Sequence, residues 1–268
     1  MKRRSHSSDA SRRYHDRVAR RYDSIYDDAY WEFHDRLTWA AIRPNLPADL
    51  SIACCDLGCG TGKWGLKLLK SGYATTFVDH SANMIEQVRA KLGSREKKAT
   101  LLVADIAEMP SLAEQSFGLI LAMGDPLSIC TDPPRAVREM YRISRPGGIV
   151  IATADNQLAA LEPYLARASL DDLEDFVHAG RTHWLTADKR EQFVLSTFTP
   201  ATLRKMFEQA GFEVLDVIGK TILPLRRYQD HLGDAAAVER LLRMEQRLAH
   251  DPSTAAIAGH LQIRARRV

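Results

Sequence analysis

The segment Cys55-Asp56-Leu57-Gly58-Cys59-Gly60-Thr61-Gly62 joins an apolar run that begins at Ile52 to a helical pattern over residues 63–70. Three glycines at alternate positions let a backbone turn tightly and approach a ligand without obstruction by a Cβ atom. In an open α/β sheet, ligands bind beyond the carboxyl ends of the strands. The segment therefore predicts a strand, a ligand-binding turn and a helix, in that order.

The rest of the chain alternates short apolar runs with helical periodicity, which predicts an α/β fold. Helices between strands imply parallel pairing, in a doubly wound sheet with both faces covered. Only the last run, from Leu261 to Arg266, alternates apolar and polar residues, and this favours an antiparallel strand at or near the sheet edge. The seven expected strands are residues 52–56, 74–79, 100–105, 119–123, 149–153, 212–218 and 261–265.

Pattern and length predict one large domain with additions to its sheet. Residues 1–13 are strongly basic, and we expect them to form a disordered tail that precedes a single domain over residues 14–268. Three segments are extra to the sheet: a helical cover at 14–47, a lid insertion at 155–198 and a second insertion at 219–259. Insertions on the ligand-binding side of such a sheet would roof the site.

The composition is that of an ordinary globular protein, since 45% of the 268 residues are apolar and 26% are charged. No apolar run approaches the ~20 residues that cross a bilayer, which excludes a transmembrane protein. Cys54, Cys55 and Cys59 lack the spacing of a disulfide framework or a zinc site. The basic start is not followed by the apolar region of an export signal. We therefore expect a cytoplasmic protein with reduced thiols and no metal.

Acidic residues also end the second and third expected strands, at Asp79 and Asp105. A carboxylate at the strand next to the glycine turn can accept hydrogen bonds from both hydroxyls of a ribose. Asp105 lies between Ala104 and Ile106, which suits an acceptor for an adenine amine beside an apolar wall. The pattern therefore predicts recognition of a ribose and an adenine.

The glycine turn, combined with acidic residues at three strand ends, resembles the class I S-adenosylmethionine-dependent methyltransferases. The resemblance covers roughly residues 56–219, and Pro146-Gly147-Gly148 and Ala210-Gly211-Phe212 are similar to later landmarks of that family. It implies a Rossmann-like sheet of seven strands with the last one antiparallel. It also implies a methyltransferase that uses S-adenosylmethionine as its cofactor.

The resemblance further implies a donor site. Backbone groups of the three glycines would contact the methionyl part, with Asp56 near its amino group, and Asp79 would bind the ribose. His80 and Met84 would flank the adenine, and Tyr22 belongs to a segment that folds over the donor in many relatives. The expected donor-site residues are Asp56, Gly58, Cys59, Gly60, Gly62, Asp79, His80, Met84, Asp105, Ile106, Met123 and Tyr22.

The acceptor is expected to be a small molecule, because the long insertions suit an enclosed pocket. Methyl transfer depends mainly on positioning, so no universal catalytic side chain is expected. His178 and His183 in the lid, together with Tyr22, are the candidates for a general base, and Trp184 for a pocket wall. The acceptor, the methylated atom and the choice between monomer and homodimer stay open.

Three features of the sequence bear on other functions. Residues 1–21 carry eight basic and two acidic side chains, and such an arm would also suit an RNA methyltransferase or an RNA-binding module. An NAD-dependent oxidoreductase would need GxGxxG, yet Lys63 stands at the last glycine position. Asp125 and Asp155-Asn156 resemble the ligands of catechol-type O-methyltransferases, but they lie one or two residues further from their strands. We therefore expect no metal there.

Overall fold

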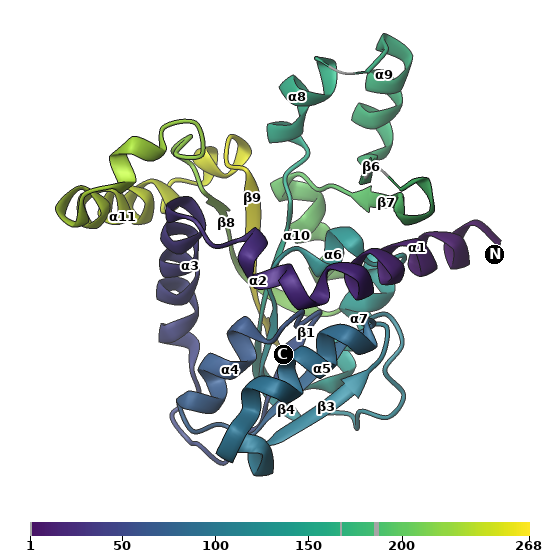
Figure 1. The fold of residues 1–268 in the computed structure, drawn as a ribbon, viewed down its shortest axis with the longest axis vertical. Coiled ribbons are helices and arrows are strands. Elements are labelled where there is room, and N and C mark those ends of the chain that lie inside the picture. The colour runs from purple at the N-terminus through teal and green to yellow at the C-terminus, as the bar shows by residue number, and fades with distance from the viewer. Residues whose placement is uncertain (1, 167, 185–187) are drawn as a thin grey trace.

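A seven-stranded sheet in the order β3-β2-β1-β4-β5-β9-β8 forms the centre of the molecule. The computed structural model describes residues 2–166, 168–184 and 188–268 (Figure 1). All seven expected strands are present, which confirms the predicted Rossmann-like sheet. They are β1 (Cys54–Leu57), β2 (Thr75–Asp79), β3 (Ala99–Val103), β4 (Phe117–Ala122), β5 (Ser144–Asp155), β8 (Phe212–Lys220) and β9 (His260–Arg267).

Strand direction decides which residues meet at the ligand-binding edge. The strands β3, β2, β1, β4 and β5 pair in parallel, whereas β9 runs antiparallel to both β5 and β8. The predicted antiparallel last strand is confirmed, and it lies one position inside the edge that β8 forms. Consequently β9 begins, at His260, on the side where β5 and β8 end, at Asp155 and Lys220.

Helices cover both faces of this sheet (Figure 1). Side chains alternate along each strand, so that Cys54 packs toward one face and Cys55 toward the other. The first face is covered by α3 (Ala29–Ile42), α4 (Lys63–Lys70) and α5 (Ala82–Leu92). The second is covered by α6 (Pro126–Ile129), α7 (Pro133–Ile143) and α10 (Pro200–Gln209).

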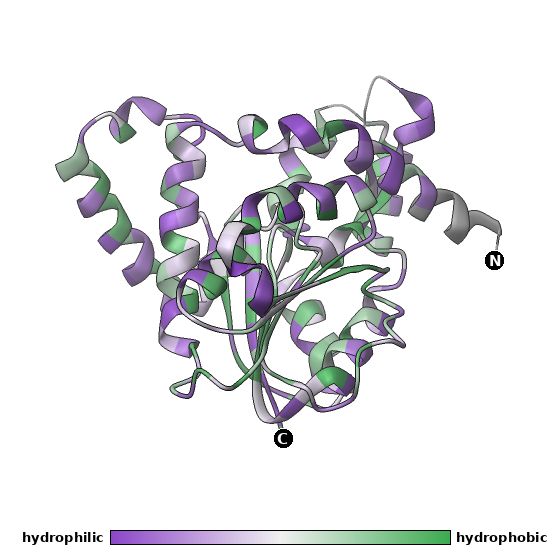
Figure 2. Cartoon of the chain, turned by 60° about the horizontal axis from the view of Figure 1, so that its bottom comes forward, coloured by the Kyte–Doolittle hydropathy of each residue, from purple (hydrophilic) through white to green (hydrophobic). Residues whose placement is uncertain are grey.

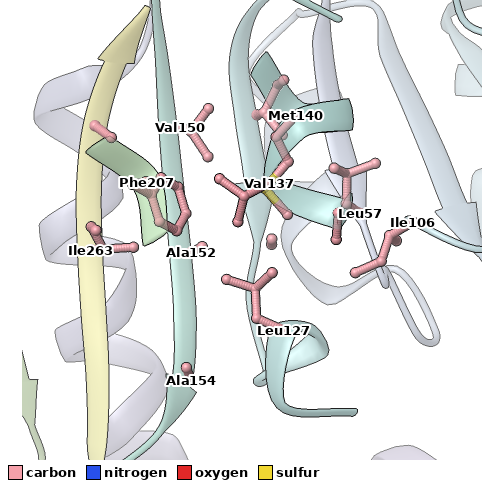
Figure 3. Packing of buried hydrophobic residues seen from close by; sticks show 14 of the residues in the cluster. Leu57, Ile106, Leu127, Val137, Met140, Val150, Ala152, Ala154, Phe207 and Ile263 are labelled. Atoms are coloured by element: carbon pink, nitrogen blue, oxygen red, sulfur yellow. The ribbon is translucent and has the colours of Figure 1, made fainter. Parts of the chain in front are cut away.

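The larger part of the core lies on the second face. Figure 3 shows Val137 and Met140 of α7 and Phe207 of α10 beside Val150 and Ile263 of the sheet, and all five side chains are fully buried. Both helices start with a proline after a residue whose side chain accepts a backbone hydrogen bond. This capping fixes where each helix begins, and therefore which face it buries.

The N-terminal segment differs from its expectation. The tail at residues 1–13 was expected to be disordered, but α1 spans Lys2–Val18 and continues through α2 (Tyr22–Ile25) into α3. The guanidinium of Arg13 donates a hydrogen bond of 2.7 Å to the carbonyl of Arg190. The expectation of a disordered tail was wrong because partners 177 residues away in the sequence hold part of this basic stretch in place.

The lid insertion contains two helices and a hairpin. The helices α8 and α9 project away from the sheet at the top of Figure 1, whereas the hairpin contacts α1. The strands of the hairpin pair antiparallel in a separate two-stranded sheet. The elements are α8 (Leu161–Leu165), α9 (Leu170–Ala179), β6 (Arg181–Trp184) and β7 (Phe193–Ser196).

The second insertion is dominated by α11 (Ala235–Ala249), which packs beside α3 (Figure 1). Figure 2 shows hydrophilic residues on the outer helices and hydrophobic residues concentrated on the strands. Within the described ranges, no helix combines the length and the apolar character that a membrane span requires. The N-terminal helices and both insertions contribute residues to the ligand-binding edge of the sheet.

Candidate active site

A cavity of about 360 Å³ lies at the sheet edge where β1, β2, β4 and β5 end. Its volume falls in the range of small-molecule sites, roughly 300–1,000 Å³. Eight of the twelve expected donor-site residues line it: Tyr22, Gly58, Cys59, Asp79, His80, Asp105, Ile106 and Met123. The structure therefore brings together most of the donor-site residues that the resemblance implied.

The glycine turn after β1 is tightly packed. Gly58 has a φ of +63°, and a Cβ atom there would lie 2.5 Å from the Cβ of Pro126. Gly62 has a φ of +88°, and its Cβ would lie 3.0 Å from a methyl group of Val88. Both positions thus require glycine for the left-handed backbone and for the close approach of α6 and α5. Neither Gly60 nor Gly62 lines the cavity.

Asp79 joins this turn to the end of β2. Its Oδ2 accepts a hydrogen bond of 2.9 Å from the Gly60 N–H, and its Oδ1 accepts one of 2.9 Å from the Ser81 N–H. Each carboxylate oxygen has a second lone pair, and the side chain lines the cavity. This geometry suits a carboxylate that accepts hydrogen bonds from two ligand hydroxyls.

Asp56 lies fully buried beneath the turn and does not line the cavity. Its Oδ2 accepts a 2.7 Å hydrogen bond from the Gly65 N–H, but its buried Oδ1 has no hydrogen-bond partner. Burial raises the pKa of Asp56 to about 7, against the lowering effect of the Gly65 hydrogen bond. Asp56 therefore supports the glycine turn from beneath, and the structure does not bring it to the cavity.

Met84 is the expected adenine contact that the structure does not bring to the cavity. It is fully buried in the first turn of α5 and packs against Val18 and Ala19 of the N-terminal cover. Its side chain therefore supports the cover, because α5 presents this position to α1. In contrast, Ala104, Asp105 and Ile106 follow β3 and line the cavity as expected.

The N-terminal helices close the donor side of the cavity. Tyr14, His15 and Tyr22 line it, and the His15 ring lies 5.5 Å from the ring of His80. Burial lowers the pKa of His15, against the raising effect of the Asp79 charge. Sequence reasoning included Tyr22 but missed Tyr14 and His15, which lie on the same N-terminal helices.

Three acidic side chains fasten this cover to the sheet domain. The Ser81 hydroxyl donates a 2.5 Å hydrogen bond to Asp16, and the Lys63 ammonium lies 2.7 Å from an Asp35 oxygen. Asp23 accepts hydrogen bonds from Lys91 and from Thr61 of the glycine turn. Burial alone would raise the pKa of Asp23, but these two hydrogen bonds lower it. The cover is therefore anchored beside the expected donor site.

The hairpin adjoins this cover, since the ring of Phe193 lies 6.1 Å from that of Tyr14 and 6.2 Å from that of His15. Trp184 of β6 and Phe193 of β7 line the cavity, with ring centroids 6.1 Å apart. The guanidinium of Arg17 on α1 donates two hydrogen bonds to the carboxylate of Glu191, of 2.7 and 2.6 Å. Hairpin and cover are therefore linked.

The two histidines expected as general bases lie elsewhere. His183 precedes Trp184 in β6, so its side chain points to the other face of the hairpin, where it is exposed. His178 is exposed in the last turn of α9. Neither lines the cavity, whereas the third candidate, Tyr22, does.

A polar cluster occupies the other end of the cavity, and it joins Asp125 and Asp155 to two residues that sequence reasoning missed, His260 and Lys220. The Nδ1 of His260 lies 2.8 Å from Oδ2 of Asp125 and 3.9 Å from Oδ1 of Asp155. The Lys220 ammonium is buried nearby and donates to Thr38 at 2.8 Å and to Gln262 at 3.0 Å. The predicted direction of the last strand could have revealed His260, because an antiparallel strand begins at the edge where the parallel strands end.

Burial and the neighbouring charges shift the pKa values of the groups in this cluster. Burial raises the pKa of Asp155 to about 6, with the Asp125 charge acting in the same direction. Burial would also raise the pKa of Asp125, but His260 lowers it overall. For His260, burial acts to lower the pKa and Asp125 outweighs it, so the pKa is raised. Burial lowers the pKa of Lys220 to about 8.

Asn156 does not join this cluster. Its side-chain amide is buried and donates to the carbonyls of Ala255 and Ala258, at 3.0 and 2.6 Å. It ties the end of β5 to the segment before β9. The three-residue arrangement that Asp125, Asp155 and Asn156 resembled in sequence is therefore not formed.

Comparisons with known proteins agree with this geometry. A family model described as a methyltransferase domain matches residues 54–148. A demethylmenaquinone methyltransferase of Staphylococcus aureus is 28% identical over 205 residues, covering 73% of this chain and 81% of the relative.

Solved structures show the same fold. A methyltransferase dependent on S-adenosylmethionine from Methanosarcina mazei has a TM-score of 0.60 at 21% identity, covering 85% of this chain and 97% of that one. A second, from Listeria monocytogenes, has a TM-score of 0.62 at 14% identity, covering 87% of this chain and 99% of that one. The [4+2]-cyclase SpnF has a TM-score of 0.56 at 21% identity, covering 87% of this chain and 80% of the cyclase.

Proposed function

Because the chain is a class I S-adenosylmethionine-dependent methyltransferase, we propose that it methylates a small molecule held in the cavity. The observation that carries this proposal is the enclosure of the cavity. The glycine turn and Asp79 form one end, Trp184 and Phe193 adjoin the N-terminal cover there, and Trp31 adds a further aromatic wall. Such a chamber accommodates a compact acceptor next to the donor.

The donor would be held by residues at the ends of β1, β2 and β3. The glycine turn would meet its methionyl part, and Asp56 would support that turn through its hydrogen bond from the Gly65 N–H. Asp79 would accept hydrogen bonds from the ribose. Asp105 and Ile106 would meet the adenine, opposite His80. Bound there, S-adenosylmethionine supplies an electrophilic methyl group on a sulfonium.

The protein's own contribution is to position the acceptor and to exclude water. Holding two reactants in the right geometry can lower a barrier by roughly 7–11 kcal/mol. The anchored cover, the Arg17–Glu191 pair and the hairpin close the cavity on three sides. Tyr22 and Tyr26, with ring centroids 5.1 Å apart, lie between the donor end and the aromatic walls.

The aromatic walls favour an acceptor with a flat ring. The rings of Tyr26 and Trp31 meet edge to face at 4.9 Å, and the ring of Tyr14 lies 5.8 Å from that of Trp184. Aromatic faces and edges bind other rings by offset or edge-to-face contact. The named activity of the staphylococcal relative, on demethylmenaquinone, also concerns a ring compound.

Nucleic acid is disfavoured as the acceptor, although the N-terminus is basic. Arg13 and Arg17 are directed to Arg190 and Glu191 of the hairpin. They therefore serve to close the cavity, and they are less available to a phosphate backbone.

The test is a release assay for S-adenosylhomocysteine across small hydroxyl, amine, thiol and carbon acceptors that carry a ring, with total RNA as a further acceptor. We expect at least one ring compound to raise release about tenfold or more above the rate without acceptor, a difference worth ~1.4 kcal/mol. Release that only RNA stimulates, with affinity that falls steeply as salt rises, would contradict the small-molecule proposal.

A further inference from the structure

The cavity contains a histidine whose position is fixed by a carboxylate. His260 is the first residue of β9, and its Nδ1 lies 2.8 Å from Oδ2 of Asp125, which follows β4. Both side chains line the cavity. The pair lacks hydrogen-bond geometry at Nδ1, so the carboxylate acts on the ring through its charge at 2.8 Å. That charge favours a proton on Nδ1, which leaves Nε2 of the neutral ring with the free lone pair.

The turn that carries Asp125 is itself fixed. Asp125 has a φ of +62°, which is uncommon for a residue other than glycine. The Thr153 hydroxyl accepts hydrogen bonds of 3.0 Å from the backbone N–H groups of Gly124 and Asp125. The other carboxylate oxygen of Asp125, Oδ1, is buried without a hydrogen-bond partner. The pair therefore has a defined geometry and an unsatisfied polar atom inside the site.

We infer that His260, oriented by Asp125, is the general base that accepts the proton from a hydroxyl group of the acceptor. The protein is then an O-methyltransferase for a phenol or an enol. This inference rests on the proposed function and names its substrate class. A hydroxyl needs such a base, whereas an unprotonated amine or a thiolate does not. The ring belongs to the class because the His34 ring, 5.8 Å from that of His260, lies 5.3 Å from the ring of Trp31, which lines the cavity.

The acceptor oxygen forms a bond to the methyl carbon while the carbon–sulfur bond breaks, and sulfur keeps that electron pair. The hydroxyl proton passes to Nε2 of His260 and leaves from there to water. Asp125 stabilises the imidazolium that forms, and the charge of the Lys220 ammonium, which also lines the cavity, would stabilise negative charge on the oxygen.

The same side chains could be read as a cation site, because ligand atoms of Asp125, Asp155 and His260 lie within 4.8 Å of one another. The local charges favour the base. The groups that face His260 are Asp125, Asp155 and Lys220, and the His34 ring lies 5.8 Å away. One ammonium and one imidazole therefore already accompany the two carboxylates, and a divalent cation would meet the repulsion of Lys220.

The first measurement needs neither donor nor acceptor. The Cε1–H resonances of the histidines are followed by NMR against pH, and the His260 signal is assigned by its loss in His260→Gln. We expect His260 to titrate above its ordinary value, and Asp125→Asn to lower its pKa by about one unit or more. The matched variant Asp155→Asn should lower it less, because Asp155 is 3.9 Å away.

The second measurement is the pH profile of kcat/KM with a hydroxyl acceptor found in the release assay. Activity should rise as His260 loses its proton and fall again above about pH 8, where Lys220 becomes neutral. Lys220→Met should remove the fall. His260→Gln should lower kcat about 100-fold or more, while calorimetry shows S-adenosylhomocysteine affinity within about threefold.

Three results would overturn the inference: equal His260 titration in wild type and Asp125→Asn, folded His260→Gln enzyme that keeps a third or more of its kcat, or turnover restricted to amine, thiol or carbon acceptors. Stoichiometric manganese or magnesium in the purified protein, with activity lost on chelation, would likewise replace the base by a metal. If no acceptor is turned over at all, the proposed function fails, and the NMR titration still reports on the pair.

Discussion

Asp56 is a single residue whose charged form destabilises the fold. Its carboxyl is fully buried, and one of its oxygens has no hydrogen-bond partner. Its pKa in the folded protein is raised to about 7, whereas an unperturbed Asp titrates at about 3.9. Between these values the folded state binds more protons than the unfolded state. Stability must therefore fall as pH rises from about 4 to about 7.

Asp56→Asn should remove this pH dependence, because an amide does not titrate. We expect the variant and the wild type to be similar at about pH 4, and the variant to be more stable at about pH 8, by at most ~4 kcal/mol. Urea unfolding at both pH values measures the difference. A difference that is the same at pH 4 and pH 8 would mean that Asp56 is not protonated in the fold.

At the same scale, the sequence predicted the donor end of the cavity better than the acceptor end. Gly58, Asp79 and Asp105 follow strands that apolar runs reveal, so their meeting at one edge could be predicted. His260 was missed although the antiparallel direction of its strand was predicted, because that direction was not followed to the residue where the strand begins. Lys220 carries no local signal, since only its partners Thr38 and Gln262 make its burial tolerable.

At the scale of elements, the hairpin β6–β7 is the part of the lid that reaches the cavity. Its strands were not predicted, because two four-residue strands with partial exposure give no clear alternation. The position of His183, away from the cavity, follows from strand geometry. Neighbouring residues of a strand point to opposite faces, so Trp184 and His183 cannot both face the cavity.

Trp184→Ala should therefore weaken acceptor use and spare the donor. We expect kcat/KM for the acceptor to fall about fivefold or more, while S-adenosylmethionine affinity changes by less than about threefold, or ~0.7 kcal/mol. The matched variant His183→Ala, on the other face of β6, should change neither. Steady-state kinetics and calorimetry decide this. Equal losses of donor and acceptor binding in folded Trp184→Ala would show that the hairpin is not an acceptor wall.

The second insertion depends on one buried carboxylate. Glu245 of α11 accepts hydrogen bonds from the backbone N–H groups of Ile222 and Leu223, at 3.0 and 2.7 Å. It is 2% exposed, and burial raises its pKa against the effect of these two hydrogen bonds. The carboxylate thus fixes the chain that leaves β8 beside the polar cluster.

Glu245→Ala would leave two backbone donors without an acceptor, and each costs about 1–3 kcal/mol. We expect a loss of about 2–4 kcal/mol in unfolding free energy by urea titration, and a smaller loss for Glu245→Gln, which keeps one acceptor. Glu239 lies on the same helix, exposed and paired with Arg36; Glu239→Ala should cost less than about 1 kcal/mol. Similar losses for Glu245→Ala and Glu239→Ala would exclude this role.

At the scale of the whole molecule, the site joins parts that are far apart in the sequence. The sheet supplies the donor end, while α1 and the hairpin are held together by Arg17 and Glu191, 174 residues apart. The sheet could be predicted because each strand has its own apolar run and the turn after β1 has its glycines. The closure could not, because α1 has a polar surface whose partners become visible only after the hairpin is placed beside it.

The central claim is that this edge of the sheet binds S-adenosylmethionine, with Asp79 on the ribose. Calorimetric titration of S-adenosylmethionine into wild type and Asp79→Ala tests it most directly, with Asp79→Asn as the milder change and Asp125→Ala as the control at the other end of the cavity. Lost charge-assisted hydrogen bonds cost about 1.5–3 kcal/mol each, so Asp79→Ala should weaken binding at least about tenfold, and far more than Asp125→Ala does. Equal affinities for wild type and folded Asp79→Ala would contradict the account.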